Sequence, residues 1–409
     1  MFGHRSPGLP GRLVAPLLAA LLLWGAAAQA AITDGEVRIA VLTDVDGPYS
    51  ASAGQGSLIA VELAAEDFND TVAGADIQVR MADHDNDPKV AAKQAKALHA
   101  EGVDMIVGMP SSAAALAVQR TLRGTPVVLI HNGAGTTLLT GKECSRTSVH
   151  WQYNTAALAA GVGRAVAKDQ GGGRWHVMTL DHPFGKGIVD GLRETIEPMG
   201  GKVVGVTLHP FNQMRFLPLL RKALEDKPDV LALGNAGSGL VAAIRQSKEL
   251  PMSMSHTQLV SVMTLLQDIR SVGLYAAAGL QFVVPYYWDA TPASRAFSER
   301  FRKRDGTVPS SAQISNYVAT LHYLKAVAAS GQDRGAAVVD TMKQLPINDG
   351  ITQNGFIRKD GRMVHDMSFM EVKSPEDSKY PMDYFHLIRR LDGKSIFPPP
   401  EAHPCPLTQ

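Results

Sequence analysis

Two short loops carry the residue types that bind small anions. Ser111 and Ser112 follow a strand pattern that ends at Gly108, and residues 131–137, His-Asn-Gly-Ala-Gly-Thr-Thr, follow the next strand pattern. Hydroxyls and backbone N–H groups at a helix start favour an anion such as a carboxylate, because unpaired donors and the helix dipole point outward there. The same serines also suit plain helix capping, so both interpretations stay open at this point.

Aromatic side chains are few and fall in predicted loops or junctions. Only 6% of the chain is aromatic, yet this set includes Tyr49, Trp151, Tyr153, Phe184, Tyr286, Tyr287 and Trp288. Aromatic faces in a cleft offer apolar contact to a ligand. The alternative is hinge and core packing, which we expect for about half of the set.

Motifs that would indicate enzyme chemistry are missing. The sequence has no G-x-S-x-G, no G-x-x-x-x-G-K-[ST] and no H-E-x-x-H. Residues 234–239, Gly-Asn-Ala-Gly-Ser-Gly, join a strand to a helix and favour a small ligand at Asn235 over a dinucleotide. Residues 83–88 resemble a calcium loop but lack its later glycine and glutamate, so Asp87 predicts a helix start. We expect no metal and no cofactor.

Short apolar runs alternate with helical patterns, which predicts α/β architecture with parallel sheets. The first unit has strands at 37–42, 77–81, 105–107 and 127–130 and helices at 57–68, 88–100 and 113–122. A second unit repeats this rhythm, with strands at 175–179, 202–206, 230–233 and 280–284 and helices at 186–198, 216–224 and 239–247. The chain therefore predicts two similar doubly wound lobes.

The last third follows a different pattern. Helices are predicted at 292–305, 312–329 and 336–345, without strands between them, so they pack onto an existing sheet. Alternating polar and apolar residues over 357–390 predict two antiparallel strands, separated by a loop at 374–381.

Residues 1–30 have the composition of a secretory signal peptide. Arg5 and Arg12 precede an apolar run over 13–24, and Ala28-Gln29-Ala30 resembles a cleavage site. The run is shorter than the roughly 20 residues of a membrane span, so we expect a mature chain of about 379 residues without membrane insertion, starting near Ala31. We therefore expect a periplasmic protein.

Composition excludes some functions and leaves the cysteines open. Forty basic and 39 acidic residues give no cationic excess for nucleic acid. Cys144 and Cys405 are the only cysteines, and in an oxidising compartment a bridge is favoured over two free thiols.

Several segments together resemble the periplasmic substrate-binding proteins of branched-chain amino acid type ABC importers. The resemblance is carried in order by VRIAVLTDVDGPYSASAGQGSLIAVELAAEDFN, DHDNDPKVAAKQAKALHAEGVDMIVGMPSSAAALAV, VVLIHNGAGTTLLT, LDHPFGKGIVDGL and GRMVHDMSFMEVK, and it covers the whole mature chain. It implies the type I periplasmic binding fold: two lobes, joined by three crossing strands, close on a ligand and dock on a permease.

The resemblance also implies site residues. The hydroxyl loop falls on Ser111 and Ser112 and the backbone-donor loop on Gly133, Ala134 and Thr136, to hold a carboxylate. Tyr49, Trp151, Tyr153, Phe184 and Asn235 complete the expected cleft, and Asp268 is a weak match for an ammonium partner. The missing Ser-Pro-Gly-Ala-Thr run places amino-acid specificity in doubt.

These observations predict a non-enzymatic, monomeric receptor for a small organic solute. We expect lobe one at 32–144 plus 286–345, lobe two at 150–284 plus 346–390, and a tail at 391–409 tethered by Cys405. An aromatic or other small organic acid is favoured over a branched-chain amino acid. The alternatives are a sensor subunit that presents its ligand to a membrane receptor and, less favoured, a periplasmic enzyme.

Overall fold

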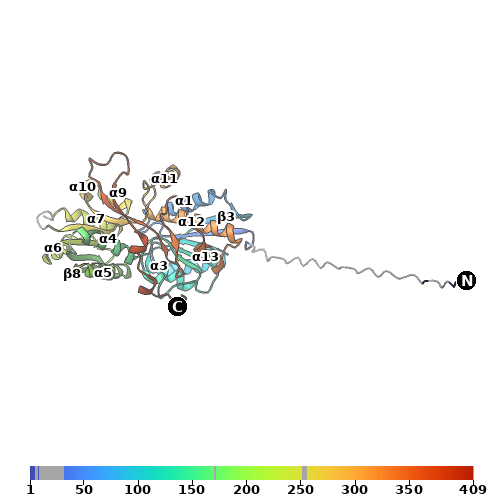
Figure 1. Ribbon diagram of the computed structural model, residues 1–409. Coiled ribbons are helices and arrows are strands. Elements are labelled where there is room, and N and C mark those ends of the chain that lie inside the picture. Colours follow the sequence, from blue (N-terminus) through green and yellow to red (C-terminus); the bar gives the residue numbers. More distant parts are fainter. Residues whose placement is uncertain (5–7, 9–31, 170–171, 251–255, 409) are drawn as a thin grey trace.

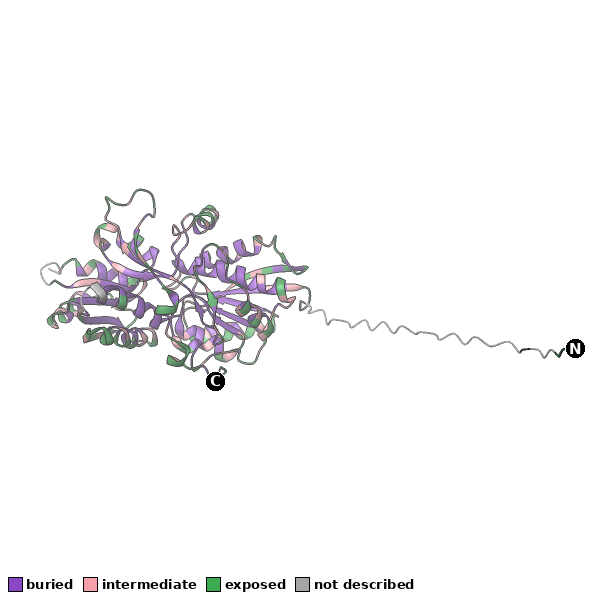
Figure 2. Ribbon diagram, in the orientation of Figure 1, coloured by how far each residue is buried: buried purple, intermediate pink, exposed green. Residues whose placement is uncertain are grey.

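The computed structural model shows two α/β lobes side by side (Figure 1) and describes residues 1–4, 8, 32–169, 172–250 and 256–408. Most of the predicted signal peptide lies outside these residues. Strands lie inside both lobes, and exposed residues concentrate on the outer helices (Figure 2). Among the described residues, no helix is long and apolar enough to cross a membrane.

The first lobe is built on a six-stranded sheet in the order β2-β3-β1-β4-β5-β6, parallel except for β2. Its strands are β1 Glu36–Thr43, β2 Thr71–Val72, β3 Ala75–Asp83, β4 Met105–Gly108, β5 Val128–His131 and β6 Ser148–His150. Its helices are α1 Gly54–Glu66, α2 Pro88–Ala100, α3 Ser112–Thr121, η1 Thr137–Leu139, α11 Pro292–Asp305, α12 Ser311–Ser330 and α13 Gly335–Gln344.

Alternation along β1 builds a core on each side of this sheet. Val37, Ile39 and Val41 belong to the cluster shared with α1 and α12, whereas Ala40 and Leu42 belong to the one shared with α2 and α3. Because successive strand residues point to opposite faces, a continuous apolar run marks a strand buried on both sides.

The second lobe holds a seven-stranded sheet in the order β15-β14-β11-β10-β9-β7-β8. Its strands are β7 Arg174–Leu180, β8 Lys202–His209, β9 Val230–Gly234, β10 Gln258–Met263, β11 Gln281–Val284, β14 Met367–Val372 and β15 Phe385–Leu391. Its helices are α4 Thr155–Asp169, α5 Pro183–Ile196, η2 Glu197–Met199, α6 Leu217–Glu225, α7 Gly237–Ser247, α9 Leu266–Val272 and α10 Leu274–Ala277. The antiparallel strands β14 and β15 confirm the prediction made for the tail.

Three crossing segments connect the lobes: residues 151–154, 285–291 and 365–366. They are joined to one another, since His365 Nε2 lies 2.6 Å from the Gln152 carbonyl and the His365 ring stacks on Tyr286. A short hairpin, β12 Phe356–Ile357 with β13 Met363–Val364, leads into the third crossing.

Residues 346–363 do not pack where the sequence placed them. Ile347, Ile351, Ile357 and Met363 belong to the first lobe's core, although 346–390 was expected in the second lobe. The sequence pattern there contains no feature that shows where the chain crosses, so the lobe bounds need this adjustment.

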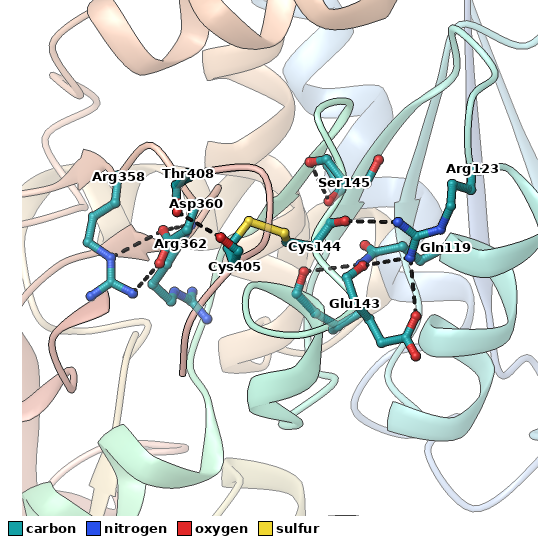
Figure 3. The surroundings of a disulfide bond; sticks show 12 residues. Gln119, Arg123, Glu143, Cys144, Ser145, Arg358, Asp360, Arg362, Cys405 and Thr408 are labelled. Atoms are coloured by element: carbon teal, nitrogen blue, oxygen red, sulfur yellow. Dashed lines mark hydrogen bonds and ion pairs between the residues drawn. A yellow bond between two sulfur atoms is a disulfide. The ribbon is translucent and has the colours of Figure 1, made fainter. Parts of the chain in front are cut away.

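The C-terminal tail returns from the second lobe to the first. After β15 it forms α14 Gly393–Ile396 and η3 Pro400–Ala402, and the Phe397 ring lies beneath the Arg362 guanidinium at the hinge. Cys405 is bonded to Cys144, which confirms the predicted bridge, and both half-cystines are buried (Figure 3). The tail is therefore a fourth, covalently fixed connection between the lobes.

Candidate functional site

The hydroxyl loop and the glycine loop meet at the carboxyl ends of β4 and β5. Ser112 begins α3, and its Oγ accepts hydrogen bonds from the backbone N–H groups of Gly135 at 3.0 Å and Thr136 at 3.2 Å. With both acceptor positions used, the Ser112 hydroxyl proton is free to donate. Ser112 therefore holds the glycine loop in place and keeps its own proton for a further hydrogen bond.

Gly133 sits at a turn that only glycine adopts easily. Its φ is +99°, and a Cβ there would lie 3.1 Å from Pro110 Cα, so the two loops approach backbone to backbone. Tyr153 of the first crossing donates its hydroxyl proton to the Gly133 carbonyl at 2.8 Å. This bond ties an aromatic of the second lobe's core to the first lobe's loop.

Further aromatic contacts cross the cleft. A Cβ built on Gly135 would lie only 2.8 Å from Phe184 Cδ2, so Phe184, at the start of α5, packs directly on the glycine loop. At the mouth, the rings of Tyr49 and Phe211 meet edge to face with centroids 6.0 Å apart. Burial raises the pKa of Tyr49 to about 12, which keeps this phenol neutral.

Between the lobes lies a cavity of about 40 Å³. One water needs roughly 10–15 Å³ on this scale, so an amino-acid-sized ligand requires its walls to move apart. The walls come from both lobes and the first crossing: Tyr49, Ser52, Pro110, Ser112, Gly133, Gln152, Tyr153, Leu180, His182, Phe184, Ala236, Met263, Leu265 and Ala312. No Asp, Glu, Lys or Arg is present in this set of described residues.

Five residues named from the sequence line this cavity: Tyr49, Ser112, Gly133, Tyr153 and Phe184. Ser111, Ala134 and Thr136 are buried in the adjacent loops of the first lobe. Thr136 Oγ1 accepts from Leu138 N–H and caps η1, while the Ala134 carbonyl contacts His150 Nε2 at 2.6 Å. Thr136 and Ala134 therefore hold the loops of the first lobe in place and do not line the cavity.

Two other expected site residues, Trp151 and Asn235, do not line the cavity. Trp151 is fully buried in the first lobe's core against the His322 ring, so its position in a crossing segment does not bring it to the cavity. Asn235 is bonded to His209 Nε2 at 3.0 Å.

Asp268 lies beside the cavity, in an adjoining pocket that also includes Tyr49 and Leu265. Its Oδ2 accepts from the N–H of Leu265, the N-cap residue of α9, at 3.1 Å. Burial raises the pKa of Asp268 to about 6. Its carboxylate therefore bonds to the helix start and also lines this adjoining pocket, whose walls come from both lobes.

Among the lining residues that the sequence did not single out, His182 and Gln152 have the larger polar side chains. His182 caps α5, and its short loop position gives no sign that it faces a ligand. Gln152 donates to Ser311 Oγ at 2.9 Å, and its buried Oε1 has no partner among the described residues. Neither residue belongs to a recognisable motif.

The sequence analysis also did not identify a buried arginine at the hinge, Arg362, which has histidines nearby. Arg362 is fully buried and donates to the carbonyls of Tyr153 and Met363. Burial, together with this nearby guanidinium, lowers the pKa of His131 to about 3. Burial likewise lowers the pKa of His365 to about 4. Both rings are therefore neutral at pH 7. They are hydrogen-bonded to Gln119 and to the Gln152 carbonyl, respectively.

Asp44, Asp83 and His84 bring potential metal-ligand atoms within 4.8 Å of one another. However, His84 Nδ1 accepts from Asn86 N–H at 3.0 Å, so the ring proton lies on Nε2, which then has no lone pair for a metal. Asp87 accepts from the N–H groups of Lys89 and Val90, which confirms the helix start predicted there. This loop does not fit a metal.

Two lobes, each with ligand-facing loops at the carboxyl ends of parallel strands, define a binding protein that encloses a small molecule in the cleft between them. A family model for periplasmic binding proteins matches residues 36–379, and the chain belongs to this family. Its members bind solutes for transport and are not enzymes, as expected from the missing catalytic motifs.

Individual relatives agree with this assignment. A periplasmic binding protein from Burkholderia mallei is 35% identical, superposes with a TM-score of 0.85, and the match covers 92% of this chain and all of that one. A branched-chain amino acid ABC transporter ligand-binding protein from Burkholderia xenovorans is 27% identical, also at a TM-score of 0.85, over 91% of this chain and all of that one. A Leu/Ile/Val-binding protein homolog from Brucella melitensis is 27% identical over 72% of each chain.

Proposed function

We propose that this protein is a periplasmic receptor that captures a small organic carboxylate between its lobes and delivers it to an ABC importer permease. The observation that carries the proposal is the cavity itself, walled by both lobes. A ligand that touches both walls stabilises the closed arrangement, because it binds that state better than an open one. The Ser112 hydroxyl and the loop around Gly133 would hold the carboxylate.

The lining favours an acid without an ammonium group over an amino acid. A buried ammonium needs a carboxylate or several acceptors to offset its desolvation. None of the described residues that line this cavity is acidic. Asp268 lines the adjoining pocket instead, and its Oδ2 already accepts from Leu265 N–H. The faces of Tyr49, Tyr153 and Phe184, with Leu180 and Met263, suit an aromatic or branched apolar body.

The direct test is a thermal-shift screen of the mature protein, unfolded and refolded beforehand to remove retained ligand. The panel contains aliphatic amino acids, aromatic acids, amides and short carboxylates. A ligand present at 100 times its Kd adds about 2.7 kcal/mol to the free energy of unfolding, which gives a clear rise in Tm. We expect carboxylates without an ammonium group to raise the Tm most; no rise with any class would refute the receptor function.

Delivery to a permease needs a second experiment. Deleting the gene should abolish uptake of the radiolabelled solute found in the screen, and the wild-type gene should restore it. Normal uptake in the deletion strain would count against a role in transport, even if binding were confirmed.

A further inference from the structure

His182 is the second lobe's one polar side chain in the described lining with a hydrogen-bond donor left over. The other residues from that lobe are Leu180, Phe184, Ala236, Met263 and Leu265, all apolar. Tyr153 has already given its hydroxyl proton to the Gly133 carbonyl. Within this cavity, polar recognition by the second lobe's side chains therefore depends on His182.

The hydrogen bonding of His182 fixes which ring nitrogen carries the proton. His182 is the N-cap of α5, and its Nδ1 accepts from Phe184 N–H at 3.3 Å. Burial lowers the pKa of His182, so the ring is neutral at pH 7. A neutral ring that accepts at Nδ1 is protonated at Nε2, and this N–H has no hydrogen-bond partner among the described residues.

We infer that His182, on the second lobe's wall of the cavity, selects ligands that carry a second hydrogen-bond acceptor on the side facing that lobe. The inference rests on the proposed function, in which the first lobe's loops hold the carboxylate. A para-substituted aromatic acid such as 4-hydroxybenzoate has this layout: an apolar ring lies between two polar ends. His182 is a specificity-determining residue in this arrangement.

Ligands with an apolar far end are disfavoured for a physical reason. When the lobes close on a methyl or isobutyl group, the His182 N–H loses water and gains no partner. Sites built to hydrogen-bond a polar group reject the apolar analogue strongly, because their own buried group is left unpaired. Leucine and 4-methylbenzoate should therefore bind weakly.

The experiment compares two ligands of nearly equal size, 4-hydroxybenzoate and 4-methylbenzoate, by calorimetry on the wild type and on His182→Asn. Asparagine is a good N-cap, so it preserves the start of α5, but it is too short to replace Nε2 in the cavity. In the wild type we expect 4-hydroxybenzoate to bind at least about tenfold more tightly. In His182→Asn the ratio should fall to within about threefold.

The ratio is measured within one protein, so a general loss of stability does not produce it. His182→Ser, a second variant that supplies a serine N-cap, should show the same fall in the affinity ratio. Equal binding of the two ligands by the wild type, a preserved ratio in the variants, or a preference for leucine would each overturn the inference while leaving the receptor function standing. If the wild type binds no member of this pair and no member of the wider panel, the proposed function itself fails.

Discussion

At the scale of single residues, Ser112 and Ser111 look alike in the sequence but differ in the structure. Ser112 Oγ accepts two backbone N–H groups of the glycine loop, whereas the Ser111 side chain makes no capping bond at the start of α3. Ser112→Ala leaves two buried donors unpaired and should lower the free energy of unfolding by about 2 kcal/mol. Urea denaturation measures this loss.

The matched control is Ser111→Ala, which should cost about 0.5 kcal/mol or less, since no hydrogen bond is lost. Similar losses for the two variants would show that the two hydrogen bonds to Ser112 Oγ add no measurable stability. In addition, only Ser112→Ala should weaken binding of the carboxylate identified in the screen.

At this scale, the sequence predicted only some of the residues that line the cavity. A serine-glycine pair of loops after adjacent strands indicated where the first lobe would face the cleft, and Ser112 and Gly133 do line the cavity. Trp151 and Asn235 do not line the cavity, because a position in a loop gives no information on which way a side chain turns. His182 was missed because one histidine at a helix start has no distinguishing pattern.

At the scale of elements, the start of α5 packs on the loop after β5 across the cleft. The contact depends on Gly135, whose missing side chain admits the Phe184 ring. In Gly135→Ala the new methyl would stand 2.8 Å from Phe184 Cδ2, so the two lobes cannot approach as closely. We expect ligand affinity to fall about tenfold, the equivalent of about 1.4 kcal/mol, as measured by calorimetry.

Gly239→Ala serves as the comparison, because a Cβ there would meet its nearest neighbour at 3.8 Å, an ordinary contact, within α7. This variant should bind ligand like the wild type. Small-angle scattering with saturating ligand should show a larger radius for Gly135→Ala alone. Unchanged affinity in Gly135→Ala would mean that this contact is not used in the bound state.

Elements with strong periodicity were predicted well, and α2 and α11 have the expected bounds. Strand β10 and helix α4 were missed. The sequence of β10, QLVSVM, mixes polar and apolar residues although the strand is central in its sheet. Helix α4 contains Gly161 and Gly163 in its interior, and glycine argues against a helix.

At the scale of the whole molecule, the disulfide joins residues 261 apart in the sequence and links the tail of the second lobe to the first. The chain-entropy model gives a ceiling of roughly 5 kcal/mol for so long a loop, and smaller values are usual. Replacing both cysteines by serine should therefore lower the free energy of unfolding by about 2–4 kcal/mol, as measured by urea denaturation.

Ligand affinity is the companion measurement. Neither Cys144 nor Cys405 lines the cavity, so the double variant should bind the screened carboxylate within about twofold of the wild type at a temperature where it is folded. Reductant should destabilise the wild type and leave the double variant unchanged. An identical urea midpoint for both proteins would show that the bridge adds no stability.

The bridge also changes what a protease can do to this chain. Phe211 and Met214 are about half exposed and lie between the two bonded cysteines in sequence. A single cut there would split the backbone, yet the Cys144–Cys405 bond would still hold the halves as one covalent body. Such nicked protein would run as one band without reductant and as two with it.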